Sequence, residues 1–346
     1  MKLKILVLTR DVRAYKAAFY QSDFIVELAK QHTCVYYGPG FLGFNEEDSA
    51  ETVLRKTQVR DCPHDLIVVA HSWLADTPNG PISPMRSFDL KSATIPAALF
   101  LNKEYTRLSE KLDWAESSSI DAVFSHHHEI EQLARGRAFP AFFLPFAFSH
   151  DRFGRVESEI REDFGFTGIL QNPSNSELQG NVRAEVQSEL FHSFLDIPLI
   201  KRNAYRNIKI QWRSWTGNRV KDIVSAMLLR PRASEKKYVS LISETGIWLN
   251  GPSPLGLIST RYFECMAVGA IVLTSSTPGL DRVFPEDTYV EFSGVKDFRE
   301  KLLWLLGNPN EASQIRNRAK KFVYLGHTWS HRVQDFIKQA TNLPIN

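Results

Sequence analysis

Cysteine is scarce in this chain, and its pattern excludes a fold held together by disulfides. Three cysteines, Cys34, Cys62 and Cys265, are spread over 346 residues, without any C-x-x-C pair. Such spacing supplies neither a disulfide framework nor a zinc site. We therefore expect reduced thiols and a cytoplasmic protein.

Long apolar runs are absent as well. A membrane-spanning helix needs about 20 consecutive apolar residues, and the nearest stretch, Ala138–Phe148, is shorter and contains two prolines. We expect no transmembrane segment, while peripheral membrane contact through Ala138–Phe148 stays open. The first residues, MKLKILVLTR, predict a strand instead of a signal peptide because their apolar core, Ile5–Leu8, is only four residues long.

A strong excess of either charge is also lacking. The chain has 42 basic and 39 acidic residues, a net charge of +3, which argues against a dedicated nucleic-acid binder. A hydrophobic fraction of 43% is ordinary for a folded protein. At this length two domains are expected.

Short apolar runs alternate with amphipathic stretches through the first half of the chain. Phe19–Gln31 has apolar residues at helical spacing. The apolar runs resemble strands that are covered on both faces of a parallel sheet. The predicted strands are Lys4–Thr9, His32–Tyr37, Asp65–Ala70, Ile95–Leu101, Asp121–Ser125 and Ala141–Leu144.

A second alternating series follows a charged connection at Pro145–Phe166. Its predicted strands are Gly165–Leu170, a basic strand region at Leu199–Gln211, Gly246–Leu249 and Ala270–Thr274. Its predicted helices are Val182–Phe194, Asn218–Leu229, Arg261–Val268, Asp297–Leu306 and Glu311 to the end. The expected fold class is α/β, with two Rossmann-like parallel-sheet domains facing a cleft. The predicted domains are 1–150 and 165–325, followed by a C-terminal helix at 326–346 for which a return to the first domain is considered.

The segment Leu257–Leu273 carries the clearest chemical signal. Arg261 and Glu264 are one helical turn apart and share a face near the start of a predicted helix. A helix amino end favours anions, a guanidinium can clamp two diphosphate oxygens, and a carboxylate can accept both hydroxyls of a ribose. This combination predicts a site for a nucleotide-activated donor. The alternative is a surface ion pair on an amphipathic helix.

The same segment, S-x-R-x-x-E-x-x-A-x-G-A, resembles the donor-binding helix of GT-B glycosyltransferases, most closely the spore-maturation-type branch. Three further matches flank it. Ile247–Asn250 is similar to the strand before the donor loop, Phe298–Pro309 to a helix and turn, and His327–Trp329 with Arg332 to the H-T-[WY]-x-x-R motif. The resemblance covers about 239–336.

The resemblance implies a donor site in the second half of the chain. Arg261 and Arg183 neutralise the diphosphate beside a helix that starts at Ser259 and Thr260, and Glu264 binds the ribose. The implied co-substrate is a nucleotide-diphosphate sugar, and UDP-sugars are the donors that this family uses most often. No bound metal and no tightly bound cofactor are expected, and the lack of a clear D-x-D motif agrees.

Two glycines, Gly256 and Gly168, affect the predicted donor site. Many retaining members carry E-x7-E, but Gly256 stands in place of the first glutamate. Contact with the donor sugar is therefore assigned to Asn250 or to the backbone of Gly251–Leu257. Gly168 is expected to let the backbone approach the phosphates closely; for Gly168 and Arg183 the alternative is an ordinary surface turn.

Two residues that follow predicted strands are candidates for a catalytic base. Glu104 follows Ile95–Leu101 and His71 follows Asp65–Ala70, so both are expected at the carboxyl edge of the sheet. Either can deprotonate an acceptor hydroxyl. The alternative for Glu104 is an acidic residue in the first turn of a helix. The alternative for His71 is a loop residue whose hydrogen bond is satisfied within the protein.

Two other groups have several interpretations. Lys201–Arg219 interleaves basic and aromatic residues, which suits a base pocket, a solvated strand or a nucleic-acid surface. His126–His128 are adjacent and cannot point at one metal ion from a regular element. No metal site is expected there, and a loop that touches a sugar fits better.

The predicted function is therefore transfer of a sugar from a nucleotide-diphosphate donor to a hydroxyl of a glycan, lipid or small molecule. A DNA glucosyltransferase of phage type is the first alternative, although the small net charge makes nucleic acid the less favoured acceptor. A non-catalytic module that binds sugar nucleotides is the second alternative.

Overall fold

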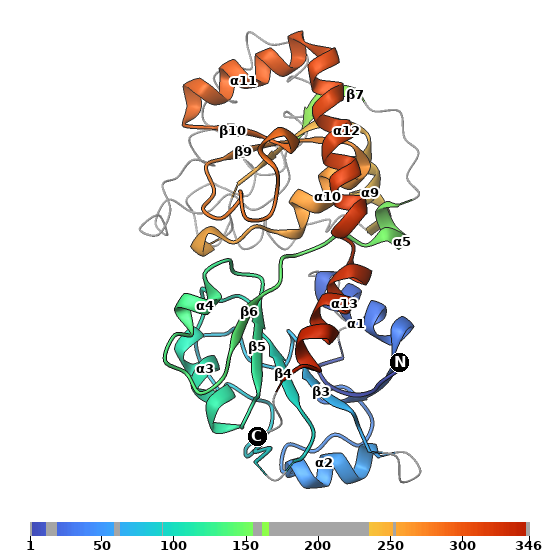
Figure 1. The fold of residues 1–346 in the computed structure, drawn as a ribbon, viewed down its shortest axis with the longest axis vertical. Helices are drawn as coiled ribbons and strands as arrows, with labels where there is room; N and C mark the ends of the chain where they lie inside the picture. The colour runs from blue at the N-terminus through green and yellow to red at the C-terminus, as the bar shows by residue number, and fades with distance from the viewer. Residues whose placement is uncertain are drawn as a thin grey trace, which may run out of the picture. The chain divides into compact units, whose positions relative to one another are not determined.

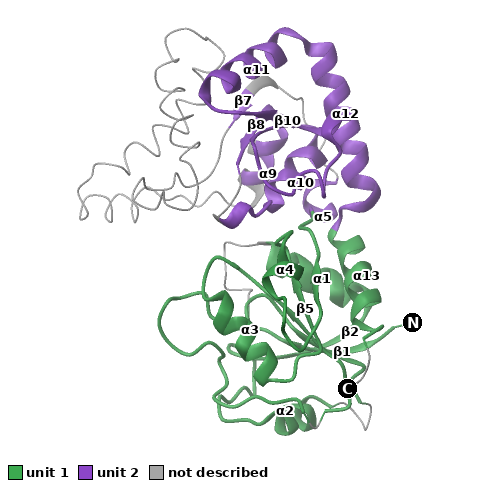
Figure 2. Ribbon diagram, turned by 60° about the vertical axis from the view of Figure 1, so that its left-hand side comes forward, with its two compact units in different colours: residues 1–147, 329–346 green, residues 148–328 purple. Residues whose placement is uncertain are grey.

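The computed structural model describes residues 2–11, 19–58, 63–91, 93–154, 161–165, 235–251 and 254–343 (Figure 1). They fall into two compact units (Figure 2). Unit 1 comprises residues 1–147 and 329–346, and unit 2 comprises residues 148–328. The C-terminal helix α13 (Trp329–Ala340) is therefore part of unit 1.

Unit 1 is built on a parallel sheet with the described strand order β2-β1-β3-β4-β5-β6. β3, β4 and β5 are buried at every position, as their nearly unbroken apolar sequences predict. The strands are β1 (Lys4–Leu8), β2 (Thr33–Tyr37), β3 (Leu66–Val69), β4 (Ala97–Phe100), β5 (Ala122–Ser125) and β6 (Ala141–Phe143).

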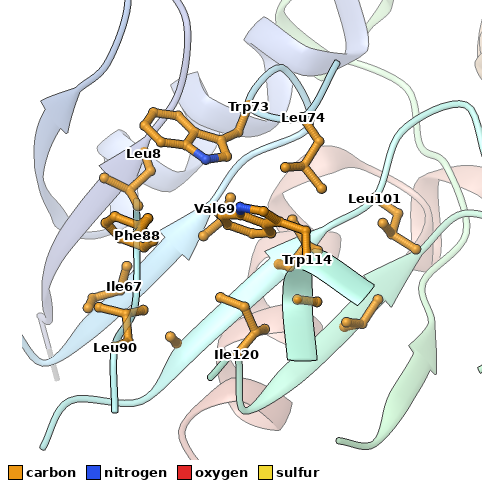
Figure 3. Packing of buried hydrophobic residues seen from close by; sticks show 14 of the residues in the cluster. Leu8, Ile67, Val69, Trp73, Leu74, Phe88, Leu90, Leu101, Trp114 and Ile120 are labelled. Atoms are coloured by element: carbon orange, nitrogen blue, oxygen red, sulfur yellow. The ribbon is translucent and has the colours of Figure 1, made fainter. Parts of the chain in front are cut away.

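Helices and loops cover both faces of this sheet. On one face, Trp73, Phe88 and Trp114 pack over Ile67 and Val69 (Figure 3). On the other face, helices α1 and α13 contact each other and cover the aromatic residues of β4 and β5, through ring pairs made by Phe24 and Phe336. The helices of unit 1 are α1 (Phe19–Gln31), α2 (Ala50–Thr57), α3 (Leu108–Ser117), α4 (Ile130–Leu133) and α13.

Unit 2 contains a second parallel sheet with the described order β10-β9-β8-β7. Its core joins the strands to α11 and α12 through apolar side chains such as Phe164, Leu273 and Phe298. The described elements are α5 (His150–Phe153), β7 (Arg161–Gly165), α9 (Glu235–Ser243), β8 (Thr245–Asn250), the 3-10 turn η4 (Pro254–Gly256), α10 (Thr260–Val268), β9 (Ile271–Ser275), the 3-10 turn η5 (Glu286–Thr288), β10 (Val290–Phe292), α11 (Val295–Gly307) and α12 (Pro309–Gly326).

The predicted α/β class with parallel sheets is confirmed, but two element predictions need correction. The first described strand of unit 2 is Arg161–Gly165, which lies within the segment interpreted as a connection; residues 166–170 lie outside the described part. The helix predicted from Glu311 to the end is two helices. It breaks at His327 and Thr328 because Thr328 pairs with Phe148 in an extended bridge. The predicted helices Val182–Phe194 and Asn218–Leu229 and the predicted strand region Leu199–Gln211 fall outside the described residues.

The apolar segment Ala138–Phe148 packs several of its side chains inside the protein. It forms β6 and the stretch that follows, and Phe139, Leu144, Phe146 and Phe148 are buried in the protein. Phe142 and Phe143 of β6 are half-buried, and peripheral membrane contact through this segment stays a prediction. Within the described residues, no helix is both long enough and apolar enough to span a membrane.

Candidate functional site

Helix α10 begins at a loop that leaves its first backbone N–H groups without a side-chain cap. Ser259 is the N-cap residue, with an extended backbone (φ −78°, ψ 166°), and its hydroxyl makes no capping hydrogen bond. In the preceding turn η4, Leu255 and Gly256 have positive φ values of 62° and 74°. A left-handed leucine is strained and such strain is typical of functional loops. Uncapped N–H groups at a helix start are suited to an anion.

Glu264 lies at the centre of a buried polar cluster in unit 2. It is 4% exposed, on the first turns of α10. The hydroxyl of Tyr238, from α9, donates to its Oε2 at 2.7 Å. The Nη2 atom of Arg152, from α5, is 4.0 Å from its Oε1. Three helices that are far apart in sequence thus contribute to one carboxylate.

The charges of this cluster stabilise one another. Burial raises the pKa of Glu264, while Arg152, the hydrogen bond from Tyr238 and Arg261 lower that pKa. Burial alone lowers the pKa of Arg261, but Tyr238, Cys265 and Glu264 raise it, and the net pKa is raised. Burial and the Glu264 charge raise the pKa of Tyr238 well above its usual value. The Tyr238 hydroxyl therefore keeps its proton and donates it in a hydrogen bond to the Glu264 carboxyl group.

Asn250 supplies a second polar group at the carboxyl end of a strand. It ends β8, opposite Thr274 of β9, and is 4% exposed. Its Nδ2 atom is buried beside the Cys265 thiol and has no nitrogen or oxygen acceptor among the described residues. An unsatisfied buried amide costs about 1–3 kcal/mol. This donor is therefore suited to an oxygen atom of a ligand.

Other residues that the sequence assigned to the donor site cannot be placed. Gly168, Arg183 and the basic stretch Lys201–Arg219 lie outside the described residues. Of the predicted donor residues, Asn250, Ser259, Thr260, Arg261 and Glu264 all lie on β8, on α10 or at the start of α10.

Glu104 is at the carboxyl edge of the sheet in unit 1, in the loop after β4. It is 3% exposed, and its Oε1 accepts a hydrogen bond of 2.5 Å from Ser125 Oγ at the end of β5. The loop contains two residues in the left-handed region, Lys103 (φ 48°) and Arg107 (φ 52°). The backbone strain again marks a loop with a constrained shape.

His71 is at the same edge but makes a different set of contacts. Its Nε2 is 2.9 Å from Nε2 of His126, whose Nδ1 is 2.7 Å from the carbonyl oxygen of Leu144. A carbonyl only accepts, so His126 Nδ1–H donates to it, and His71 Nε2–H donates to His126. Burial lowers the pKa of His71 well below its usual value and that of His126 to about 3. Both rings are therefore neutral.

The remaining histidines of the trio are buried too. His127 and His128 have stacked rings whose centroids are 4.9 Å apart. Among the described residues there is no group of three or more histidine, cysteine or carboxylate side chains that could hold a metal ion.

Sequence reasoning missed Tyr238 and Arg152. Tyr238 is 26 positions before Glu264 and on another helix. Arg152 falls in the stretch that was interpreted as an interdomain connection. Neither has a local spacing to Glu264 that could have revealed the contact, because the contacts are tertiary.

Comparison with known proteins shows what the C-terminal part of the chain is similar to. Residues 197–338 match a family described as glycosyl transferase-like, which covers β8, α10 and β9. None of the curated protein sequences matches the chain.

Several solved structures have the same fold. A glycosyltransferase from Rickettsia africae has a TM-score of 0.58 at 10% identity, with 98% of each chain covered. HepE from Anabaena, in complex with UDP and glucose, has a TM-score of 0.57 at 12% identity, covering 99% of this chain and 100% of the other. An α-glucosyltransferase in complex with UDP and DNA has a TM-score of 0.61 at 14% identity, with the same coverage.

These comparisons confirm two predictions. The chain has the GT-B fold of the glycosyltransferases. The match of residues 197–338 to a family described as glycosyl transferase-like confirms the predicted enzyme class.

Proposed function

We propose that this chain transfers a sugar from a UDP-sugar to a hydroxyl group of a glycan, lipid or small molecule. The observation that carries the proposal is the start of α10. There an uncapped helix end, the guanidinium of Arg261 and the carboxylate of Glu264 occur within one and a half helical turns. These are the three groups that a diphosphate joined to a ribose requires.

In the proposed donor site each group has one task. Arg261 and the N–H groups after Ser259 and Thr260 neutralise the leaving diphosphate, which is electrostatic stabilisation by fixed charge. Glu264 accepts the ribose hydroxyls; a carboxylate offers about four lone-pair positions, and Tyr238 uses one. Asn250 Nδ2 donates to the sugar. Gly168 and Arg183 complete the phosphate contacts.

UDP is the proposed nucleotide because the fold relatives support it. HepE was solved with UDP and glucose, and the α-glucosyltransferase with UDP. The protein cations and the start of α10 are the proposed counter-charges of the diphosphate. We further propose a cytoplasmic enzyme of the spore-maturation-type branch.

For the catalytic base we propose Glu104 ahead of His71. Glu104 accepts a single hydrogen bond through Oε1 among the described residues, so Oε2 can take a proton. His71 has its Nε2 engaged with His126 and is enclosed by Tyr20, Phe24 and Phe100. A proton on His71 is therefore strongly disfavoured.

DNA is the second candidate acceptor. The α-glucosyltransferase with the TM-score of 0.61 was solved with a 13-mer DNA, and Lys201–Arg219 is rich in basic and aromatic residues. A gel-shift with duplex DNA in about 150 mM salt decides between the two, because a DNA-modifying enzyme retains binding at that salt.

The proposed activity is tested by UDP release. The chain is incubated with a panel of UDP-sugars, with and without mixtures of glycan, lipid and small-molecule acceptors. A transferase releases UDP from one donor and does so faster when the acceptor is present. The R261A variant should lose most of this release. A protein that binds UDP-sugars but never releases UDP, under any of these conditions, is a binding module and contradicts the proposal.

A further inference from the structure

Tyr238 is next to both charged residues of the donor site although it belongs to a different helix. We propose that Tyr238, assisted by Arg152, is a positioning residue that fixes the Glu264 carboxylate for the two ribose hydroxyls. The inference rests on the proposed function, since it assumes that Glu264 binds ribose.

The geometry gives Tyr238 a single strong acceptor. Its hydroxyl donates to Glu264 Oε2 at 2.7 Å, which is the length of a good charge-assisted hydrogen bond. Its ring packs edge-on against Phe153 of α5, with centroids 6.4 Å apart. The phenol is therefore held in place from one side and directs its proton toward the carboxylate.

Arg152 acts on the other oxygen of the same carboxylate. Its Nη2 is 4.0 Å from Glu264 Oε1, and its side chain is 11% exposed. One oxygen is thus oriented by a hydrogen bond and the other is attracted by a charge. With both oxygens restrained, the plane of the carboxylate is fixed before a ligand arrives. Binding then costs less side-chain ordering, which is the advantage of preorganisation.

The contact also favours the ionised form of Glu264 against the effect of burial. A carboxylate in a buried site tends to take up a proton, and a protonated carboxyl group is a poorer acceptor. The hydrogen bond from Tyr238 and the charge of Arg152 both favour the ionised form. Loss of Tyr238 therefore weakens ribose binding in two ways, through geometry and through charge.

Tyr262 on the same helix as Glu264 shows what a merely structural tyrosine looks like. It is fully buried, and its hydroxyl pairs at 2.7 Å with the neutral hydroxyl of Thr274. A Tyr-to-Phe change removes one buried hydroxyl at either position. Only the change at Tyr238 removes a partner of the ribose-binding carboxylate, so Y262F is the matched control.

The experiment measures the ribose preference of the site by calorimetric titration. UDP and 2′,3′-dideoxy-UDP are titrated into the wild-type protein and into the variants Y238F, R152Q, Y262F and E264Q. We expect the wild type to prefer UDP by more than about tenfold, because hydrogen bonds to a charged group are lost with the dideoxy compound. E264Q should lose most of this preference.

The positioning role predicts a graded result. Y238F should reduce the preference for UDP over dideoxy-UDP by about tenfold, while its affinity for dideoxy-UDP stays close to that of the wild type. R152Q should reduce the preference less, because its contact is longer. Y262F should lower the melting temperature and leave the preference unchanged.

The outcomes that overturn the inference are separate from those that overturn the proposed function. If E264Q loses the preference while Y238F and R152Q keep it, Glu264 binds ribose without their help and the inference is wrong. If the wild type itself binds UDP and dideoxy-UDP equally, Glu264 does not bind ribose, and the donor site as proposed is wrong. If Y238F does not fold, the preference of R152Q for UDP over dideoxy-UDP tests the inference by itself.

Discussion

At the scale of single residues, the donor site depends on charged side chains that are stabilised by neighbouring polar groups of the protein. Glu264 and Arg261 are a helical turn apart beside Tyr238; Glu264 is buried and Arg261 is half-buried. An isolated buried charge would be strongly destabilising. The cluster avoids this cost and still presents acceptor and donor positions to a ligand.

The raised pKa of Glu264 predicts that UDP affinity depends on pH. The ionised carboxylate accepts the ribose hydroxyls, so affinity for UDP should be full at pH values well above the raised pKa of Glu264. It should fall as the pH drops through the raised pKa of Glu264, above the ordinary 4.5 of a glutamate. Titration calorimetry between pH 4.5 and 8 measures this. The E264Q variant should show a flat profile, and a flat profile in the wild type would contradict the role of Glu264.

Asn250 is predicted to discriminate between a nucleotide and a nucleotide sugar. Its buried Nδ2 has no oxygen or nitrogen acceptor in the described part of the chain, so the sugar is its proposed partner. N250A should weaken UDP-sugar binding by about tenfold, the value of one hydrogen bond to a buried donor. Its affinity for UDP should change less than twofold. Equal losses for both ligands would show that Asn250 acts on the fold of the site instead.

At the scale of secondary-structure elements, helix α13 is fastened to unit 1 by a buried arginine. Arg332 is 4% exposed; its Nε donates to the carbonyl oxygens of Pro145 at 2.7 Å and Phe146 at 3.3 Å. This arginine belongs to the H-T-W-x-x-R motif, so the motif has a structural task in this chain.

Removal of that arginine should loosen α13. R332A leaves two carbonyl groups without their donor, and we expect a loss of about 2–3 kcal/mol in the free energy of unfolding. Its exposed partner Asp335, at 3.4 Å, provides the control. D335N should change stability by less than about 0.5 kcal/mol, because exposed ion pairs contribute little. Urea unfolding followed by tryptophan fluorescence measures both. Similar values for the two variants would contradict the anchoring role.

The elements that could be predicted from the sequence are those with strong apolar periodicity. The predicted helix Phe19–Gln31 has the observed bounds of α1, and β3, with the sequence LIVV, lies inside its predicted run. β7, with the sequence REDFG, was missed because its charges are typical of a connection. Likewise, the Arg261–Glu264 pair is visible in sequence because residues three apart share a helix face. The contacts of Tyr238 and Arg152 depend on packing between helices and leave no local pattern.

At the scale of the whole molecule, the neutral histidine pair makes unit 1 sensitive to acid. His71 and His126 are buried as neutral rings, whereas both have a pKa near 6.5 in the unfolded chain. The unfolded state therefore binds more protons below pH 6.5. Stability should be greatest above that pH and fall as the pH drops toward the low folded-state pKa values, by up to about 1.4 kcal/mol per pH unit for each histidine.

Denaturant unfolding between pH 4.5 and 7.5 tests this dependence. H71Q removes one titrating ring and should reduce the slope of stability against pH by up to about 1.4 kcal/mol per pH unit. An unchanged slope in H71Q would mean that His71 is already protonated in the folded protein.

The central claim is that Arg261 holds the diphosphate of the donor. It is tested most directly by calorimetric titration of UDP and UMP into the wild type, R261K and R261A. The wild type should prefer UDP over UMP by at least about tenfold, since a guanidinium clamps two phosphate oxygens. R261K should keep part of this preference and R261A should lose it, with UMP affinity much less affected. If R261A binds UDP as tightly as the wild type does, the diphosphate lies elsewhere and the account is wrong.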